Sequence, residues 1–150
     1  MGEPCYLDDL TLGQRFSTAS LTVTAADIQE FSRKFDPQPF HVDEDQAART
    51  FFRGLAASGW HVAALTMRLI VDAAPFAGGV IGAGAEVEWP KPTRAGDVLR
   101  VESEIVEIIP SRSKPDRAIV RVRCVTLNQR NEVAQTLVAK LLVWKRPAVP

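Results

Sequence analysis

The chain is poor in the residues that build metal centres and disulfide frameworks, with only two histidines and two cysteines among its 150 residues. Cys5 and Cys124 lie far apart and do not have the spacing of a metal-ligand pair. A zinc site would need further ligands at short spacing, and the sequence offers none. Sparse cysteine is typical of a reducing cytosol, although a single disulfide stays compatible with the sequence. We therefore expect a cytoplasmic protein without a metal.

Charge of one sign is not in excess, because 18 basic residues balance 18 acidic residues. A nucleic-acid-binding domain normally carries a basic stripe, so nucleic acid is not expected as a partner. The N-terminus lacks the basic stretch and the apolar run of a signal peptide. The longest apolar stretch, residues 59–71, contains His61 and Arg68 and is too short to cross a bilayer. We therefore expect no contact with a membrane.

The overall composition is that of a globular domain, with 46% hydrophobic and 24% charged residues. A chain of this length can bury a sizeable core without disulfides or metals. No repeat, low-complexity segment or linker divides it. We expect one domain that covers residues 1–150.

The first elements are predicted from hydrophobic periodicity and from capping residues. Residues 15–23 have the composition of a strand. Thr24 and Asp27 then form a capping-box pattern, with aspartate in place of the commoner glutamate, ahead of apolar residues at helical spacing. The pattern predicts a short helix over residues 25–35.

A pair of prolines follows this helix. Proline disfavours helical backbone at the residue before it, so Pro37 and Pro39 predict a stiff, extended segment over residues 36–41. Asp43 can cap a second helical stretch that reaches Ala48 and extends as far as Phe51.

The rest of the chain predicts one buried helix and then a sheet. Residues 58–72 are helical in pattern and apolar on nearly all faces, which is typical of a helix inside a core. The glycine-rich segment 78–84 precedes a strand rather than a helix, so we interpret it as a loop and not as a nucleotide site. Strands are expected at 80–89, 98–109, 118–127 and 133–144. Short connections require antiparallel pairing, and such a sheet can wrap around the apolar helix in an α+β domain.

Asp36 and His41 are the strongest candidates for chemistry. They flank the proline pair on a segment between two helices, and rigidly held loops often carry catalytic groups. An aspartate beside a histidine can hold and activate one water and can transfer protons near neutral pH. On spacing alone, a purely structural role is the better interpretation, with Asp36 ending the helix and His41 in a loop.

Ser58 and Gly59 stand at the start of the apolar helix. Free backbone amides and the helix dipole at such a position favour negative charge, and glycine lets a ligand approach the backbone closely. A thioester oxygen that gains charge in a transition state needs such stabilisation. Taken alone, a capping serine and a packing glycine are the simpler interpretation. His61, on an apolar helix, is interpreted as a core residue and is given no catalytic role.

These features together resemble the MaoC-like family of (R)-specific enoyl-CoA hydratases and related acyl dehydratases. The resemblance covers nearly the whole chain, and the Asp-x-x-Pro-x-His unit in this context is fairly specific. It is carried by LGQRF at residues 12–16, FDPQPFHVD at 35–43, ASGWH at 57–61, WPKP at 89–92 and Gly96-Asp97.

The resemblance implies a hotdog fold, in which an antiparallel sheet wraps around a central helix, and a homodimer or higher homo-oligomer. It implies a coenzyme A or acyl-carrier thioester as substrate and no cofactor. Asp36 and His41 would activate water for the β-carbon and handle the proton at the α-carbon. The Gly59 amide would bind the thioester oxygen, and Ser58 and Trp60 are candidate substrate-binding residues.

Two positions depart from the family pattern, and two other functions stay open. Hydratases of the family commonly carry His-Gly where this chain has Ser58-Gly59, and often a serine where it has Ala64. The first alternative is a hotdog acyl-CoA thioesterase, because one fold serves both reactions. The second is a non-catalytic subunit that binds acyl thioesters. Acyl chain, carrier and stereochemistry cannot be predicted from this sequence.

Overall fold

A computed structural model describes residues 3–149 of the chain. Its strands are β1 (Arg15–Ser17), β2 (Leu21–Thr22), β3 (Ile81–Glu88), β4 (Val98–Pro110), β5 (Arg117–Leu127) and β6 (Val133–Trp144). Its α-helices are α1 (Ala25–Phe35), α2 (Pro39–Val42), α3 (Glu44–Ala47) and α4 (Gly59–Ala73), preceded by the 3-10 turn η1 (Leu7–Asp9). No helix within this range is long and apolar enough to span a membrane.

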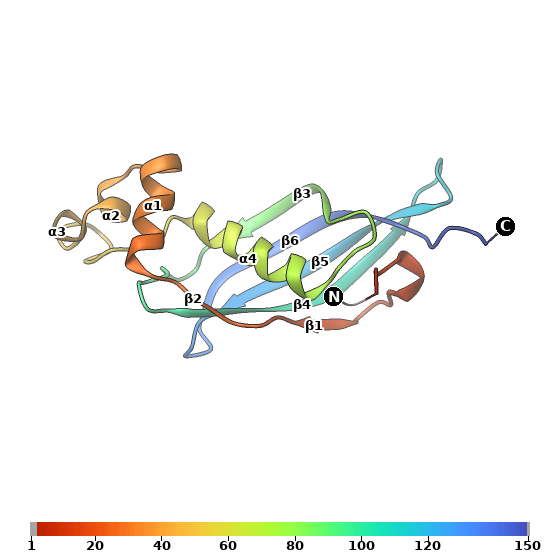
Figure 1. The fold of residues 1–150 in the computed structure, drawn as a ribbon, viewed down its shortest axis with the longest axis horizontal. Coiled ribbons are helices and arrows are strands. Elements are labelled where there is room, and N and C mark those ends of the chain that lie inside the picture. Colours follow the sequence, from red (N-terminus) through yellow and green to blue (C-terminus); the bar gives the residue numbers. More distant parts are fainter. Residues whose placement is uncertain (1–2, 150) are drawn as a thin grey trace.

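The strands form one antiparallel sheet in the order β1-β4-β5-β6-β3, with β2 also paired to β4. The four long strands agree with the predicted ranges to within one residue at each end. Figure 1 shows α4 lying along the sheet. Alternate residues of the strands point toward this helix and form an apolar core with Leu69 and Ile70. The predicted α+β arrangement of one sheet around one long helix is confirmed.

Helix α4 differs from its prediction in one respect. Its inner side is buried and includes Val62, Leu69 and Ile70. Its outer side is not covered, because Trp60 is 62% exposed, Met67 41% and Val71 45%. The expectation that the helix is buried on most faces is therefore wrong for the single chain, because one sheet can cover only one side of a helix.

The predicted strand over residues 15–23 is present in two pieces. β1 and β2 both pair with β4, but the pairing is interrupted between them. There the Thr18 hydroxyl accepts a hydrogen bond from the Val101 amide at 2.9 Å, a position that a strand carbonyl would otherwise take. A threonine side chain that replaces the backbone in this way breaks a regular ladder.

Helix α1 begins and ends where it was predicted. Thr24 accepts a hydrogen bond from the Asp27 amide at 3.1 Å, and the Asp27 carboxylate accepts one from the Thr24 amide. Asp43 caps α3 by accepting from the Gln46 amide, but this helix ends at Ala47 and does not reach Phe51.

The segment 36–41 is extended only in its first part. Gln38 has extended backbone, and Asp36, at φ −152° and ψ 67°, lies outside the helical region. Pro39, however, starts the short helix α2, so His41 lies on a helical turn and the prediction of an extended His41 is wrong. The reason is that proline suits the first position of a helix, where its fixed φ is favourable and no amide is needed.

Candidate active site

Three short stretches of chain meet at the N-terminal end of α4. Asp36 follows the last residue of α1, His41 lies on α2, and Ser58 and Gly59 form the start of α4. Figure 1 shows α1, α2 and α3 gathered at this end of the long helix. The structure therefore brings the four main candidate residues together from three separate elements.

Asp36 is the centre of a small hydrogen-bond network. Its Oδ2 lies 2.7 Å from the Ser58 hydroxyl and 3.3 Å from Nε2 of His41, and its Oδ1 accepts from the Gln38 amide group at 2.6 Å. Partial burial raises the pKa of the Asp36 carboxyl. The hydrogen bonds from Ser58 and Gln38 and the charge of His41 more than offset this, so the pKa lies below its ordinary value. Asp36 is consequently a carboxylate at neutral pH.

His41 is held by its other ring nitrogen. The ring is buried, and Nδ1 lies 2.6 Å from the carbonyl oxygen of Ala56. Because a carbonyl oxygen can only accept, Nδ1 must carry a proton in this contact. The nitrogen that can gain or lose a proton is therefore Nε2, which faces Asp36. The rings of Phe40 and Phe52 lie beside the imidazole, at 4.6 and 6.3 Å between centroids.

The start of α4 presents free amides. Ser58 is the N-cap residue, but its hydroxyl does not cap the helix because it donates to Asp36 instead. Within residues 3–149, the amides of Gly59, Trp60 and His61 find no hydrogen-bond acceptor. Such amides carry the positive end of the helix dipole and favour an oxygen that gains negative charge.

Gly59 is in close contact with the indole of Trp89. A Cβ at this position would come within 2.6 Å of Cε2 of Trp89, a distance that real contacts do not reach. Trp89 is fixed in turn, because its Nε1 donates to Gln135 at 2.8 Å and its ring meets Trp60 edge to face at 5.2 Å. The absence of a side chain at Gly59 thus lets an aromatic wall lie directly against the helix start.

One cavity of about 500 Å³ adjoins this helix start. Its lining is mostly apolar and aromatic, with a lysine at one side. His41 and Gly59 both line it, whereas Trp60 does not, since its side chain is largely exposed and lies against Trp89. The lining residues are His41, Phe51, Phe52, Ala57, Gly59, Val62, Trp89, Pro90, Lys91, Pro92, Thr93 and Ala134.

His61 has the surroundings of a core residue. Its ring is buried and stacks on Phe31 at 4.7 Å, with 8° between the ring planes. Burial lowers the pKa of His61, so the ring is neutral at neutral pH. It does not line the cavity that contains His41.

A family model described as the MaoC like domain matches residues 9–127. The chain belongs to the MaoC-like family. A MaoC-like dehydratase from Rhodospirillum rubrum, known from its crystal structure, is 54% identical, with a TM-score of 0.94 over 96% of this chain and 99% of that chain. The hotdog fold expected from the resemblance is thereby confirmed.

Curated relatives of this MaoC-like chain are more distant. Uncharacterized protein YdeM from Bacillus subtilis is 37% identical, over 83% of this chain and 88% of its own. An (R)-specific enoyl-CoA hydratase from Rhodospirillum rubrum is 28% identical, over 71% of this chain and 74% of its own. The family thus includes proteins named as dehydratases and as enoyl-CoA hydratases.

Three groups of the MaoC-like site were not predicted from the sequence: the Gln38 amide group, the Ala56 carbonyl and the Trp89 indole. The Ala56 contribution comes from the backbone, which no residue type reveals. Trp89 belongs to the WPKP motif that carries the family resemblance, but its contact with Gly59 depends on how β3 ends beside α4. A glycine at the start of an otherwise apolar helix was the available signal that something approaches the backbone there.

Proposed function

We propose that this MaoC-like chain is a hydro-lyase that adds water reversibly to a 2-enoyl thioester of coenzyme A or of an acyl carrier, giving a 3-hydroxyacyl thioester. The proposal is carried by two lining residues of one cavity: His41, whose Nε2 lies against the Asp36 carboxylate, and Gly59, whose amide is free. Water activation and stabilisation of a carbonyl oxygen are the two requirements of this reaction, and both are supported at one place.

The proposed roles follow from the hydrogen bonds. Asp36 and His41 hold one water, whose oxygen forms a bond to the β-carbon while the electrons of the double bond move toward the α-carbon. One proton of the water passes to the dyad and one proton passes from the dyad to the α-carbon, so the enzyme ends in its starting state. The Gly59 amide donates to the thioester oxygen, which gains charge in between. No cofactor is needed, because the polarised carbonyl supplies the electron sink.

Two further residues have proposed supporting roles. Ser58 was a candidate for substrate binding, and its hydroxyl donates to Asp36, which supports a role in orienting the carboxylate. Trp60 lies outside the cavity, where it contacts the edge of Trp89, so its proposed contact with substrate would come at the outer rim.

Both cysteines are free thiols, which supports the proposed cytoplasmic location.

We propose that the active form is a homodimer. The uncovered side of α4 exposes Trp60, Met67 and Val71, and β3, which exposes Ile81, is an end strand of the sheet. An apolar helix side next to an open strand edge is a surface that a second copy can cover symmetrically. Pairing of two β3 strands would also satisfy backbone groups that an edge strand leaves free.

The decisive experiment incubates the protein with 2-enoyl-CoA thioesters of increasing acyl length. Loss of the conjugated double bond and release of free thiol are followed in parallel. We expect the first signal without the second, and its disappearance in His41→Ala. Thiol release would show a thioesterase instead. Absence of both signals, with binding seen by calorimetry, would show a non-catalytic thioester-binding subunit.

A further inference from the structure

The connection between α3 and α4 carries two of the groups that hold the dyad. Its residue Ala56 supplies the carbonyl that binds Nδ1 of His41, and its last residue, Ser58, binds Asp36. The geometry of the dyad therefore depends on how this connection is held. The connection has little regular structure of its own, and it includes Arg53 with a φ of +54°, which is uncommon for a residue with a side chain.

Arg94, from the loop between β3 and β4, binds this connection at three carbonyls. Its Nη1 donates to Gly54 at 3.0 Å and to Leu55 at 3.3 Å, and its Nη2 donates to Phe52 at 2.6 Å. Within residues 3–149, no carboxylate forms an ion pair with Arg94. The planar guanidinium is thus used as a multiple donor to the backbone, a geometry that a lysine cannot reproduce.

The residue before Arg94 completes the attachment. The peptide plane between Ala56 and Ala57 is bound on both sides: the Ala56 carbonyl accepts from His41, and the Ala57 amide donates to the Thr93 carbonyl at 2.8 Å. A peptide group is rigid and planar, so these two bonds fix the direction in which the carbonyl points. Residues 93–94 therefore determine the orientation of the acceptor for His41.

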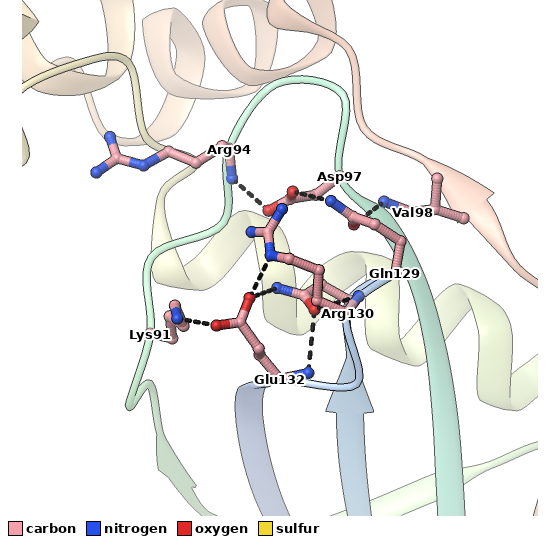
Figure 2. Close-up of polar contacts among 8 residues, drawn as sticks. Lys91, Arg94, Asp97, Val98, Gln129, Arg130 and Glu132 are labelled. Atoms are coloured by element: carbon pink, nitrogen blue, oxygen red, sulfur yellow. Dashed lines mark hydrogen bonds and ion pairs between the residues drawn. The ribbon is translucent and has the colours of Figure 1, made fainter.

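Arg94 is itself anchored to the rest of the fold. Its amide donates to Asp97 Oδ2 at 2.8 Å, and Asp97 Oδ1 accepts from Gln129 at 2.9 Å, in the turn between β5 and β6. Figure 2 shows this chain of contacts and the Arg94 guanidinium pointing away from Asp97. In the same turn Glu132 binds Lys91 and Arg130, contacts that lower the pKa of Glu132 to about 2. The loop that carries Arg94 is consequently tied to the sheet at two points.

We propose that Arg94 is a positioning residue for His41. Arg94 holds the connection at Phe52, Gly54 and Leu55 and so keeps the Ala56 carbonyl against Nδ1 of His41. This contact keeps the proton of neutral His41 on Nδ1 and leaves the lone pair on Nε2. Without this support the ring can take the other tautomer, with its proton on Nε2 and no base directed at the water. The kinetic part of this inference rests on the proposed hydratase function, whereas the part about the tautomer does not.

The test compares Arg94→Gln and Arg94→Lys with the unchanged protein. Imidazole ¹⁵N shifts are recorded at alkaline pH, and they are simple to assign because the chain has only two histidines. We expect a single Nδ1-protonated form in the unchanged protein and a shift toward the Nε2-protonated form in both variants. We also expect kcat to fall about 10- to 100-fold, as for a displaced catalytic group, with KM changed less than about two-fold.

Arg100→Gln is the matched control, because this arginine binds Glu102 on β4 and Asn131 in the turn between β5 and β6, and does not contact the connection. Its ¹⁵N shifts and kcat should equal those of the unchanged protein. A lysine variant with normal tautomer and kcat would show that only charge matters and would overturn the proposal. A decrease in Tm with an unchanged His41 tautomer would also overturn the proposal, and so would failure of both Arg94 variants to fold. If the unchanged protein hydrates no substrate, the ¹⁵N comparison still decides the positioning role.

Discussion

The Ser58 hydroxyl donates to Oδ2 of Asp36 at 2.7 Å, the same oxygen that faces Nε2 of His41 at 3.3 Å. The side-chain oxygen of a serine at a helix N-cap usually accepts a hydrogen bond from a helix amide, and here it does not. The hydroxyl instead stabilises a carboxylate outside the helix, and the amides at the helix start stay free. One serine therefore links the orientation of the dyad to the availability of the Gly59 amide.

Removing this hydroxyl should change the acid side of the pH profile. The hydrogen bond from Ser58 lowers the pKa of Asp36, so Ser58→Ala should raise that pKa. If the reaction needs the carboxylate, the acidic limb of kcat/KM against pH moves to higher pH. Ionised Asp36 contributes stability that is present above its unfolded pKa and is lost as pH falls through its folded pKa. In Ser58→Ala this contribution should be smaller, and its loss should be complete at a higher pH.

Ser32→Ala is the control for this profile, because Ser32 is equally buried and its hydroxyl has no hydrogen-bond partner within the described chain. Its acidic limb should coincide with that of the unchanged protein. An acidic limb that stays in place in Ser58→Ala would remove Asp36 from the groups that control the rate.

Loss of either dyad member should remove most of the activity without unfolding the protein. Asp36→Asn and His41→Gln each remove one proposed proton-transfer group, and such a group typically contributes about 10²-fold or more to the rate. Hydration of an enoyl-CoA thioester measures the rate, and circular dichroism measures the fold. His61→Phe is the matched control, since His61 is neutral, stacked on Phe31 and outside the cavity. Full activity in Asp36→Asn would contradict the dyad.

Gly59→Ala should be destabilising because of Trp89. The added Cβ would lie 2.6 Å from the indole, so either the ring or the helix start must move. Overpacking of this kind costs about 1–3 kcal/mol. We expect a lower free energy of unfolding in denaturant and a loss of activity, because the Gly59 amide moves with the helix start.

A double variant separates this clash from other effects of alanine. In Trp89→Leu the ring is absent, so adding Gly59→Ala to it should cost less stability than in the unchanged protein. If Gly59→Ala lowered the stability equally with and without the indole, Trp89 would not be the reason that glycine is needed at position 59.

The sequence predicts the elements of this fold well where a local signal exists. The capping box of Thr24 and Asp27 gives α1, and alternation of apolar residues gives the long strands. Two local signals compete at Pro39. Helical backbone is disfavoured at the residue before a proline, whereas the proline itself is favoured at the first position of a helix. The first effect alone predicts an extended His41, whereas the second places His41 on the short helix α2.

The candidate site is less accessible to prediction than the fold. Asp36 and His41 are visible in the sequence because their side chains have a typical chemistry. The Ala56 carbonyl that fixes the tautomer of His41 belongs to an alanine, and any residue would supply the same group. Arg94 acts on backbone from a distant loop, so its role depends on tertiary structure that no local pattern encodes.

A single charge on the exposed side of α4 should disrupt the proposed dimer. Met67 lies on the exposed side of α4, so Met67→Glu would place an unpaired charge in the proposed dimer interface, at a cost of about 3–5 kcal/mol. The dimer dissociation constant should then rise by 100-fold or more, roughly as that cost implies. Light scattering across a dilution series measures it. Leu12→Glu is the control, because Leu12 is exposed but precedes β1 at the opposite edge of the sheet from β3. A dimer that persists in Met67→Glu, or an unchanged protein that is monomeric, would contradict this interface.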